Sequence, residues 1–288
     1  QYSHAVCFER CHYDHPNHFI LKATIGVIGC GWLGLPLAVA LVKDGYTVHG
    51  SKTYKEKIEA LMEKGILPFL IGLSEDQIEG PIKEFLRGLE ILIINVPPKL
   101  RYGNKEDYVQ KMKLLHIAIS ESSITKIVFV SSTSVYGDVD GEVTEETPPC
   151  PITESGVQLL ASENVFREDP NLHTTILRYG GLIGPERHPI KNLAGRRVVN
   201  GNFPVNLIHL NDAVAIICKI VSQGYWGEIF NGVYPHHPSK RDYYLAEAKK
   251  KGLSLPEFSS NHNKEGKKIT SCRLINVKKF DFTTSILS

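Results

Sequence analysis

Short apolar runs alternate with amphipathic segments along most of the chain, and this alternation predicts strands interleaved with helices. The run EILIINV at 90–96 is apolar without interruption, as in a strand that helices cover on both faces. Apolar residues recur at helical spacing in 35–46, 106–120 and 152–168. Further runs typical of strands lie at 24–28, 47–50, 126–130, 174–178 and 228–231. This order predicts an α/β fold with a doubly wound parallel sheet.

Residues 29–34 read G-x-G-x-x-G between a predicted strand and a predicted helix, which is the context of a dinucleotide-binding loop. The first glycine permits the tight turn, the second leaves room for a pyrophosphate, and the third lets helix and strand pack closely. The pyrophosphate then sits on the helix N-terminus, where backbone N–H groups and the helix dipole favour an anion. We expect cofactor contacts from Gly29, Gly31, Trp32, Leu33 and Gly34.

The end of the second predicted strand indicates which cofactor this loop takes. An NAD site has Asp or Glu about 20 residues past the glycines, to bind the ribose 2′-hydroxyl, but no acid appears here before Glu56. The stretch offers instead the hydroxyl of Ser51 and the ammonium of Lys52, which suit the 2′-phosphate of NADP. NADP is therefore the predicted cofactor and NAD the alternative. In the other interpretation, Lys52 and Lys55 are solvated residues that open a helix.

The crevice of a doubly wound sheet lies at the carboxyl ends of its strands, where the strand order reverses. Asn95, Val96 and Pro97 end the strand at 90–96, and Ser131 and Ser132 follow the strand at 126–130. We expect these residues beside the cofactor.

Four further motifs resemble the extended short-chain dehydrogenases/reductases (SDRs), the nucleotide-sugar epimerase/dehydratase family. They are IVFVSSTSVYGD at 127–138, the EETPPCP segment at 145–151, LRYGGLIGP at 177–185 and VNLIHLNDA at 205–213. The resemblance covers the chain from about residue 23 and implies a Rossmann sheet with a small C-terminal substrate lobe. It implies a Rossmann domain at 23–178, rejoined by 209–232, and a lobe formed by 179–208 and 233–288. It also implies that Tyr179 flanks the nicotinamide.

In that family a Ser or Thr after the fifth strand acts with a Tyr and a Lys spaced Y-x-x-x-K. The hydroxyl falls on Ser132, but Ser155 and Leu159 stand at the Tyr and Lys positions. Serine cannot replace a phenol with a pKa of about 10, and leucine carries no charge. The pattern S-G-x-x-L-L-x-x-E, together with G-C-G-W-L-G, resembles the atypical YeeZ-like branch, which lacks the standard active site.

If the protein is an enzyme, another group has to move the substrate proton. The candidates are Tyr136, Tyr179 and His188, the last because histidine titrates near neutral pH. In the alternative interpretation, Tyr136 packs under the sheet and His188 is an exposed loop residue. We expect Arg178 to be a buried structural arginine, and His209 and Asp212 to orient backbone and cap the following helix.

Composition narrows the partners. The chain holds 33 Lys and Arg against 31 Asp and Glu, so nothing draws it as a whole to nucleic acid or an anionic membrane. No apolar run approaches the roughly 20 residues that span a bilayer, and no secretory signal is visible. Six scattered cysteines do not form a disulfide scaffold, so a cytoplasmic location is expected. A local basic run consists of Arg187, Lys191, Arg196 and Arg197. It either binds a phosphate-bearing substrate or is a solvated loop.

Residues 1–22 show neither helical nor strand periodicity, and they hold four histidines and two cysteines. A flexible extension is the prediction. Zinc bound by Cys7, Cys11 and nearby histidines is the alternative, although the spacing matches no compact zinc module. No metal site is expected.

A homodimer is expected through the helices at 106–120 and 154–168, because members of the resembled family pair through them. Both helices carry apolar residues on more than one face, at Met112, Leu115, Ile119, Val157, Leu160 and Val165.

Three functions stay open. The first is an NADP-linked oxidoreductase or epimerase/dehydratase-like enzyme with a rebuilt proton relay, acting on a nucleotide sugar or related small molecule. The second is a non-catalytic dinucleotide-binding sensor or scaffold. The third is a β-hydroxyacid dehydrogenase, which IGVIGCGWLGLPLA at 25–38 also resembles. The all-helical second half of those enzymes is not visible here.

Overall fold

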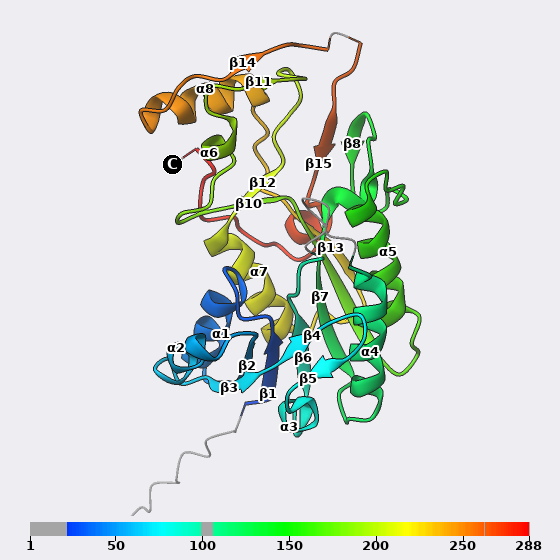
Figure 1. Cartoon of the computed structure of the whole chain (residues 1–288). Coiled ribbons are helices and arrows are strands. Elements are labelled where there is room, and N and C mark those ends of the chain that lie inside the picture. Colours follow the sequence, from blue (N-terminus) through cyan, green and yellow to red (C-terminus); the bar gives the residue numbers. More distant parts are fainter. Residues whose placement is uncertain (1–21, 99–105, 262, 288) are drawn as a thin grey trace, which may run out of the picture.

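A seven-stranded parallel sheet forms the centre of the molecule (Figure 1). The computed structural model describes residues 22–98, 106–261 and 263–287. The strand order is β13-β9-β7-β6-β1-β2-β3, which confirms the predicted doubly wound α/β fold. The strands are β1 (Thr24–Ile28), β2 (Thr47–Lys52), β3 (Leu67–Leu70), β6 (Ile91–Ile94), β7 (Lys126–Ser132), β9 (His173–Tyr179) and β13 (Ile229–Gly232).

Helices cover both faces of this sheet (Figure 1). One layer consists of α1 (Gly34–Lys43), α2 (Glu59–Met62), preceded by a 3-10 turn (Lys55–Lys57), and α7 (Leu210–Gln223). The other consists of α3 (Ile82–Leu86), α4 (Tyr108–Ser120) and α5 (Glu154–Arg167). Leu37 and Ile216 are fully buried in the first layer, and Phe85 and Met112 in the second. Burial on both faces explains why β6 is apolar at every position.

The chain order creates a topological switch point at the carboxyl end of the sheet, and the region beside it is called the crevice below. From β1 the chain moves outward to β2 and β3, and it then returns to form β6 on the other side of β1. The loops after β1 and β6 therefore leave in opposite directions. This is the switch point at which doubly wound sheets bind ligands.

A lobe of short elements lies over this end of the sheet (Figure 1). It has its own core, which includes Ile183, Ile190 and Tyr243. Its helices are α6 (Ile190–Leu193) and α8 (Lys240–Lys250). The strand pairs outside the main sheet are β10 (Gly181–Ile183) with β12 (Leu207–His209), β11 (Arg197–Val198) with β14 (Glu257–Phe258), β8 (Gly141–Val143) with β15 (Lys267–Ile269), and β4 (Gly72–Leu73) with β5 (Ile78–Glu79).

The C-terminal segment connects the sheet to the lobe. A π-helical turn, η3 (Arg273–Val277), follows β15, and Leu274 and Phe280 join the core beneath α1 and α7. The Asp212 carboxylate then accepts hydrogen bonds from the N–H groups of Thr283 and Thr284. Asp212 therefore orients the backbone of the tail, while His209 caps α7.

The faces of α4 and α5 differ from expectation. Met112, Leu115 and Ile119 are buried against the sheet and offer nothing to a partner. The exposed apolar side chains on these two helices are Ile117 at 54% and Val157 at 46%. Among the described residues, no helix has the length and hydropathy to cross a membrane.

Candidate functional site

Two glycines of the 29–34 loop are required by the packing of the protein itself. Gly29 has a φ of +95°, and a Cβ there would lie 2.4 Å from the Asn95 carbonyl oxygen. A Cβ on Gly34 would lie 2.2 Å from the Gly29 carbonyl oxygen. Any side chain at these positions would push β1, α1 and the end of β6 apart.

Gly31 differs, because no described atom lies within 4 Å of a Cβ built there. Open space beside this residue is what a pyrophosphate needs to approach the loop. The N-terminus of α1 has no side-chain cap among the described residues, so its N–H groups can meet an anion. Leu33 is buried in the core, whereas the Trp32 ring extends toward the lobe and donates to the Pro185 carbonyl. The loop therefore fits a dinucleotide.

The end of β2 holds this loop by two hydrogen bonds to Ser51. The Ser51 hydroxyl accepts the Gly29 N–H at 2.9 Å, and the Ser51 carbonyl accepts the Cys30 N–H at 3.0 Å. Lys52 follows, and partial burial lowers the pKa of its ammonium. Burial raises the pKa of the Cys30 thiol to about 12, so Cys30 is a packing residue and not a nucleophile.

The end of β6 is tied to the glycine loop. The Asn95 amide donates to the Gly29 carbonyl at 2.9 Å, so Asn95 holds the loop that it was expected to border. Val96 is held in turn by the Tyr108 hydroxyl, which donates to its carbonyl at 2.7 Å. Pro97 is exposed. No local sequence pattern indicated Tyr108, because its role depends on where α4 packs.

Ser131 belongs to a buried polar network and not to the crevice. Its hydroxyl donates to a Glu163 carboxylate oxygen at 2.6 Å. The same carboxylate receives two hydrogen bonds from Arg178, at 3.0 and 2.6 Å. Arg178 also stacks on the Tyr136 ring at 4.9 Å, so it is the buried structural arginine that was expected.

The two candidate tyrosines are buried and their hydroxyls are engaged. Tyr136 donates to the Asn231 side-chain oxygen at 2.8 Å, and Tyr179 donates to the Ala213 carbonyl. Burial raises the pKa of both phenols. In this arrangement neither hydroxyl is directed to a ligand in the crevice.

His188 lies inside the lobe. Its Nδ1 accepts the Ile190 N–H at 3.2 Å, and its Nε2 lies 2.9 Å from the Tyr243 hydroxyl. Because that hydroxyl donates to Ile286 at 3.0 Å, it has to accept from His188, and Nε2 carries the proton. Burial lowers the pKa of the imidazole. The Glu247 carboxylate, 3.5 Å from Nε2, acts in the opposite direction, and the geometry is that of a structural histidine.

Ser132 is the candidate hydroxyl that the structure leaves partly exposed. Its oxygen accepts the Ser134 N–H at 3.2 Å, and no acceptor for its own proton is found within the described ranges. Ser155 is half-buried in the first turn of α5, beside the 3-10 turn η2 (Thr133–Tyr136). Leu159 is buried in the core, where it contributes packing and no charge.

One cation near Ser132 was not found from the sequence. Lys267 on β15 donates from Nζ to the carbonyls of Gly137 at 2.6 Å and Thr133 at 3.4 Å. Partial burial lowers the pKa of this ammonium. Lys267 is 135 positions from Ser132 in the chain, so no local sequence pattern predicts that it lies near Ser132.

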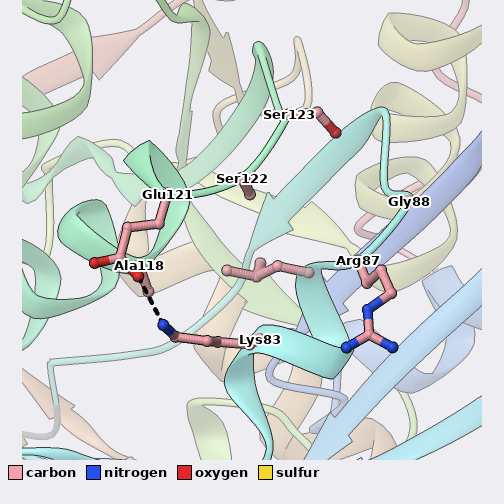
Figure 2. A pocket seen from close by; sticks show the side chains of 8 residues that line it. Lys83, Arg87, Gly88, Ala118, Glu121, Ser122 and Ser123 are labelled. Carbon is pink, nitrogen blue, oxygen red and sulfur yellow. Dashed lines mark ion pairs between the residues drawn. The ribbon is translucent and has the colours of Figure 1, made fainter.

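A cavity of about 280 Å³ lies away from the crevice, between α3 and the end of α4 (Figure 2). The Lys83–Glu121 ion pair crosses it at 3.1 Å. None of the residues expected to bind the cofactor lines it; the lining is Lys83, Leu86, Arg87, Gly88, Ala118, Glu121, Ser122 and Ser123.

In the part of the chain that the structure describes, no group of three or more His, Cys, Asp or Glu side chains is placed to hold a metal ion. The zinc alternative rested on Cys7, Cys11 and nearby histidines, which lie outside the described residues.

Comparison with known proteins assigns the family. Residues 24–131 match the model of the NAD binding domain of 6-phosphogluconate dehydrogenase. Protein YeeZ of Escherichia coli strain K12 is 35% identical over 260 residues, which cover 90% of this chain and 95% of that protein.

Solved structures share the fold at low identity. A UDP-glucuronic acid 4-epimerase from Bacillus cereus, in complex with NAD, has a TM-score of 0.74 at 18% identity and covers 91% of this chain and 92% of its own. A dTDP-glucose 4,6-dehydratase from Streptomyces venezuelae, with NAD bound, has a TM-score of 0.75 at 17% identity and covers 91% and 93%. The chain therefore belongs to the YeeZ family, an epimerase/dehydratase-like branch with the extended SDR fold.

Proposed function

We propose that this protein is an NADP-binding oxidoreductase of the epimerase/dehydratase type. The observation that carries the proposal is the open space beside Gly31, in a loop whose other glycines are closed by the protein's own backbone. Backbone atoms fill the space beside Gly29 and Gly34, whereas the space beside Gly31 is open, so a dinucleotide can approach the loop there, at the switch point.

The charge at the end of β2 supports NADP over NAD. Ser51 and Lys52 stand where an acidic residue would select NAD, and the Lys52 ammonium acts electrostatically on Cys30 of the loop. The partial burial that lowers its pKa also strengthens its attraction to an anion. A 2′-phosphate would restore the lost solvation of this ammonium.

The substrate that we propose is a nucleotide sugar or a related phosphate-bearing small molecule. The named epimerase and dehydratase act on such sugars, and the lobe carries the basic run at 187–197. The cofactor, when bound, supplies hydride transfer at its nicotinamide. In this proposal Ser132, at the end of β7, donates a hydrogen bond to a substrate oxygen; its oxygen accepts the Ser134 N–H, which leaves the hydroxyl proton for this role.

Calorimetry with the two cofactors tests the proposal. A charge-assisted hydrogen bond is worth about 1.5–3 kcal/mol, so Lys52→Ala should weaken NADP about ten- to a hundredfold and leave NAD nearly unchanged. Lys43→Ala removes an exposed charge at the far end of α1 and serves as the matched control. Equal losses for both cofactors would reject the selectivity argument.

A non-catalytic dinucleotide sensor is the second candidate. It is favoured by the engaged hydroxyls of Tyr136 and Tyr179 and by the absence of a phenol and an ammonium at Ser155 and Leu159. Bound NADP distinguishes the two: an enzyme of this type takes a hydride from the sugar and reduces NADP to NADPH, at least transiently, which rapid absorbance measurements detect, and Ser132→Ala should slow that step. A cofactor that never changes its redox state with any nucleotide sugar would favour the sensor. The cytoplasmic location stays a prediction.

A further inference from the structure

Trp32 links the glycine loop to the lobe. Its indole Nε1 donates to the Pro185 carbonyl at 3.1 Å, across 153 residues of sequence. The Arg187 guanidinium stacks on the same ring, 4.9 Å from its centroid. One residue of the cofactor loop is thus held by two residues of a lobe turn. The contact is made by the residue that follows Gly31, where a built Cβ meets nothing within 4 Å.

The turn that presents Arg187 has a defined shape. Gly184 and Arg187 exchange two backbone hydrogen bonds, at 3.0 and 3.1 Å. Between them Glu186 has a φ of +61°, in the left-handed region that residues with a Cβ rarely adopt. A Cβ on Gly184 would lie 3.1 Å from the Trp32 ring, so turn and ring are in close contact. Such a conformation persists only where surrounding contacts hold it.

The loop itself brings no charged side chain to an anion. Residues 29–34 contain no Lys or Arg, so the α1 N-terminus offers only backbone N–H groups. Arg187 is a cation of the lobe that lies against this loop, on the Trp32 ring. A guanidinium can stack on an aromatic face and donate hydrogen bonds from its edge at the same time. Because a guanidinium carries five N–H donors, an arginine that stacks on a ring and has a further partner can still bind a phosphate oxygen.

We propose that Arg187, positioned by Trp32, binds the pyrophosphate of the dinucleotide and so fixes the 184–187 turn of the lobe over the occupied loop. This inference rests on the proposed cofactor site. The turn connects β10 to α6, both of which contribute to the lobe core. Cofactor binding consequently orders the side of the lobe that meets the substrate, and the substrate site is complete only after the cofactor is in place.

Calorimetry with NAD and with ADP-ribose tests the contact. ADP-ribose carries the pyrophosphate without the nicotinamide, so Arg187→Ala should weaken both ligands by the same factor, about tenfold or more. Arg187→Lys keeps the charge but loses the planar fork, and an intermediate loss is expected. Arg167→Ala removes an exposed charge at the end of α5 and should change neither affinity. Arg187 is exposed, so its variants should keep the wild-type melting temperature.

Fluorescence gives a second readout. The chain has two tryptophans, and Trp226 lies beside Lys126 at the start of β7, so Trp226→Phe leaves Trp32 as the reporter. In that background ADP-ribose should change the Trp32 emission, and Arg187→Ala should remove most of the change. Hydrogen exchange of the 184–188 amides should slow on binding in the wild type and not in the variant.

The outcomes separate this inference from the proposed function. If the wild type binds neither ligand, the cofactor site is wrong and both fall. If the wild type binds and Gly31→Val abolishes binding, but Arg187→Ala stays within twofold for both ligands, the pyrophosphate contact alone is overturned. A loss that appears with NAD and not with ADP-ribose would likewise overturn it, because it would place Arg187 at the nicotinamide half.

Discussion

Substitutions at Gly31 and Gly34 should separate the binding of the dinucleotide from the stability of the fold. The two glycines are three residues apart in one motif, yet their surroundings differ completely. A Cβ at Gly34 would lie 2.2 Å from the Gly29 carbonyl oxygen, whereas a Cβ at Gly31 would meet no described atom within 4 Å. Gly31→Val should therefore affect the ligand, and Gly34→Ala should affect the protein.

The expected magnitudes follow from these contacts. The clash at Gly34 is with backbone, which cannot rotate away, and overpacking of this kind costs about 1–3 kcal/mol. A melting temperature lower by roughly 2–10 °C is expected for a chain of this size. Gly31→Val should change the free energy of unfolding by less than about 1 kcal/mol. Its methyl groups would occupy the pyrophosphate position, and losing two charge-assisted hydrogen bonds lowers affinity at least about a hundredfold.

Thermal unfolding and calorimetry on the same preparations measure both effects. Gly31→Val should melt with the wild type and bind no NADP at concentrations that saturate the wild type. A Gly31→Val protein that is folded and binds with unchanged affinity would refute the assignment of residues 29–34 to the pyrophosphate. A Gly34→Ala protein with unchanged stability would show that β1 and α1 are less closely packed than the structure has them.

Three other predictions concern stability and assembly. Asp212→Ala should cost about 2–4 kcal/mol and speed proteolysis of the tail at Thr283, because it removes three hydrogen bonds to that segment; an unchanged cleavage rate would contradict this role. Burial raises the pKa of the Glu145 carboxyl. The free energy of unfolding that Glu145 contributes, relative to Glu145→Gln, should therefore be greatest at acid pH and be lost as pH rises through the raised folded-state pKa. Urea titrations in which wild type and variant show the same pH dependence would contradict this expectation. If the expected homodimer forms through α4 and α5, the wild type should show a dimer mass by light scattering at micromolar concentration, and Ile117→Asp with Val157→Asp should show a monomer mass; a wild-type monomer would exclude this dimer.

Local patterns in the sequence predicted the architecture and the glycine loop. The helical spacing of α1 follows from burial of one face of a helix with a period of 3.6 residues. The uninterrupted apolar run of β6 follows from burial of both faces of the strand. The roles of Gly29, Gly31 and Gly34 follow from their spacing in the turn between β1 and α1. The same local signals did not say which apolar face of α4 packs on the sheet and which is left to solvent.

The availability of each candidate group was decided by the tertiary structure. Tyr136 and Tyr179 satisfy their hydroxyls with partners 95 and 34 residues away, and Arg187 meets Trp32 across 155 positions. A sequence motif shows that a hydroxyl or a guanidinium is present. Its hydrogen-bond partner is set by how separate elements pack, because a buried polar atom bonds whatever the fold brings within about 3 Å. For this reason the sequence predicted the glycine loop, and only the folded chain showed that both tyrosines are engaged and that Arg187 of the lobe stacks on Trp32 of that loop.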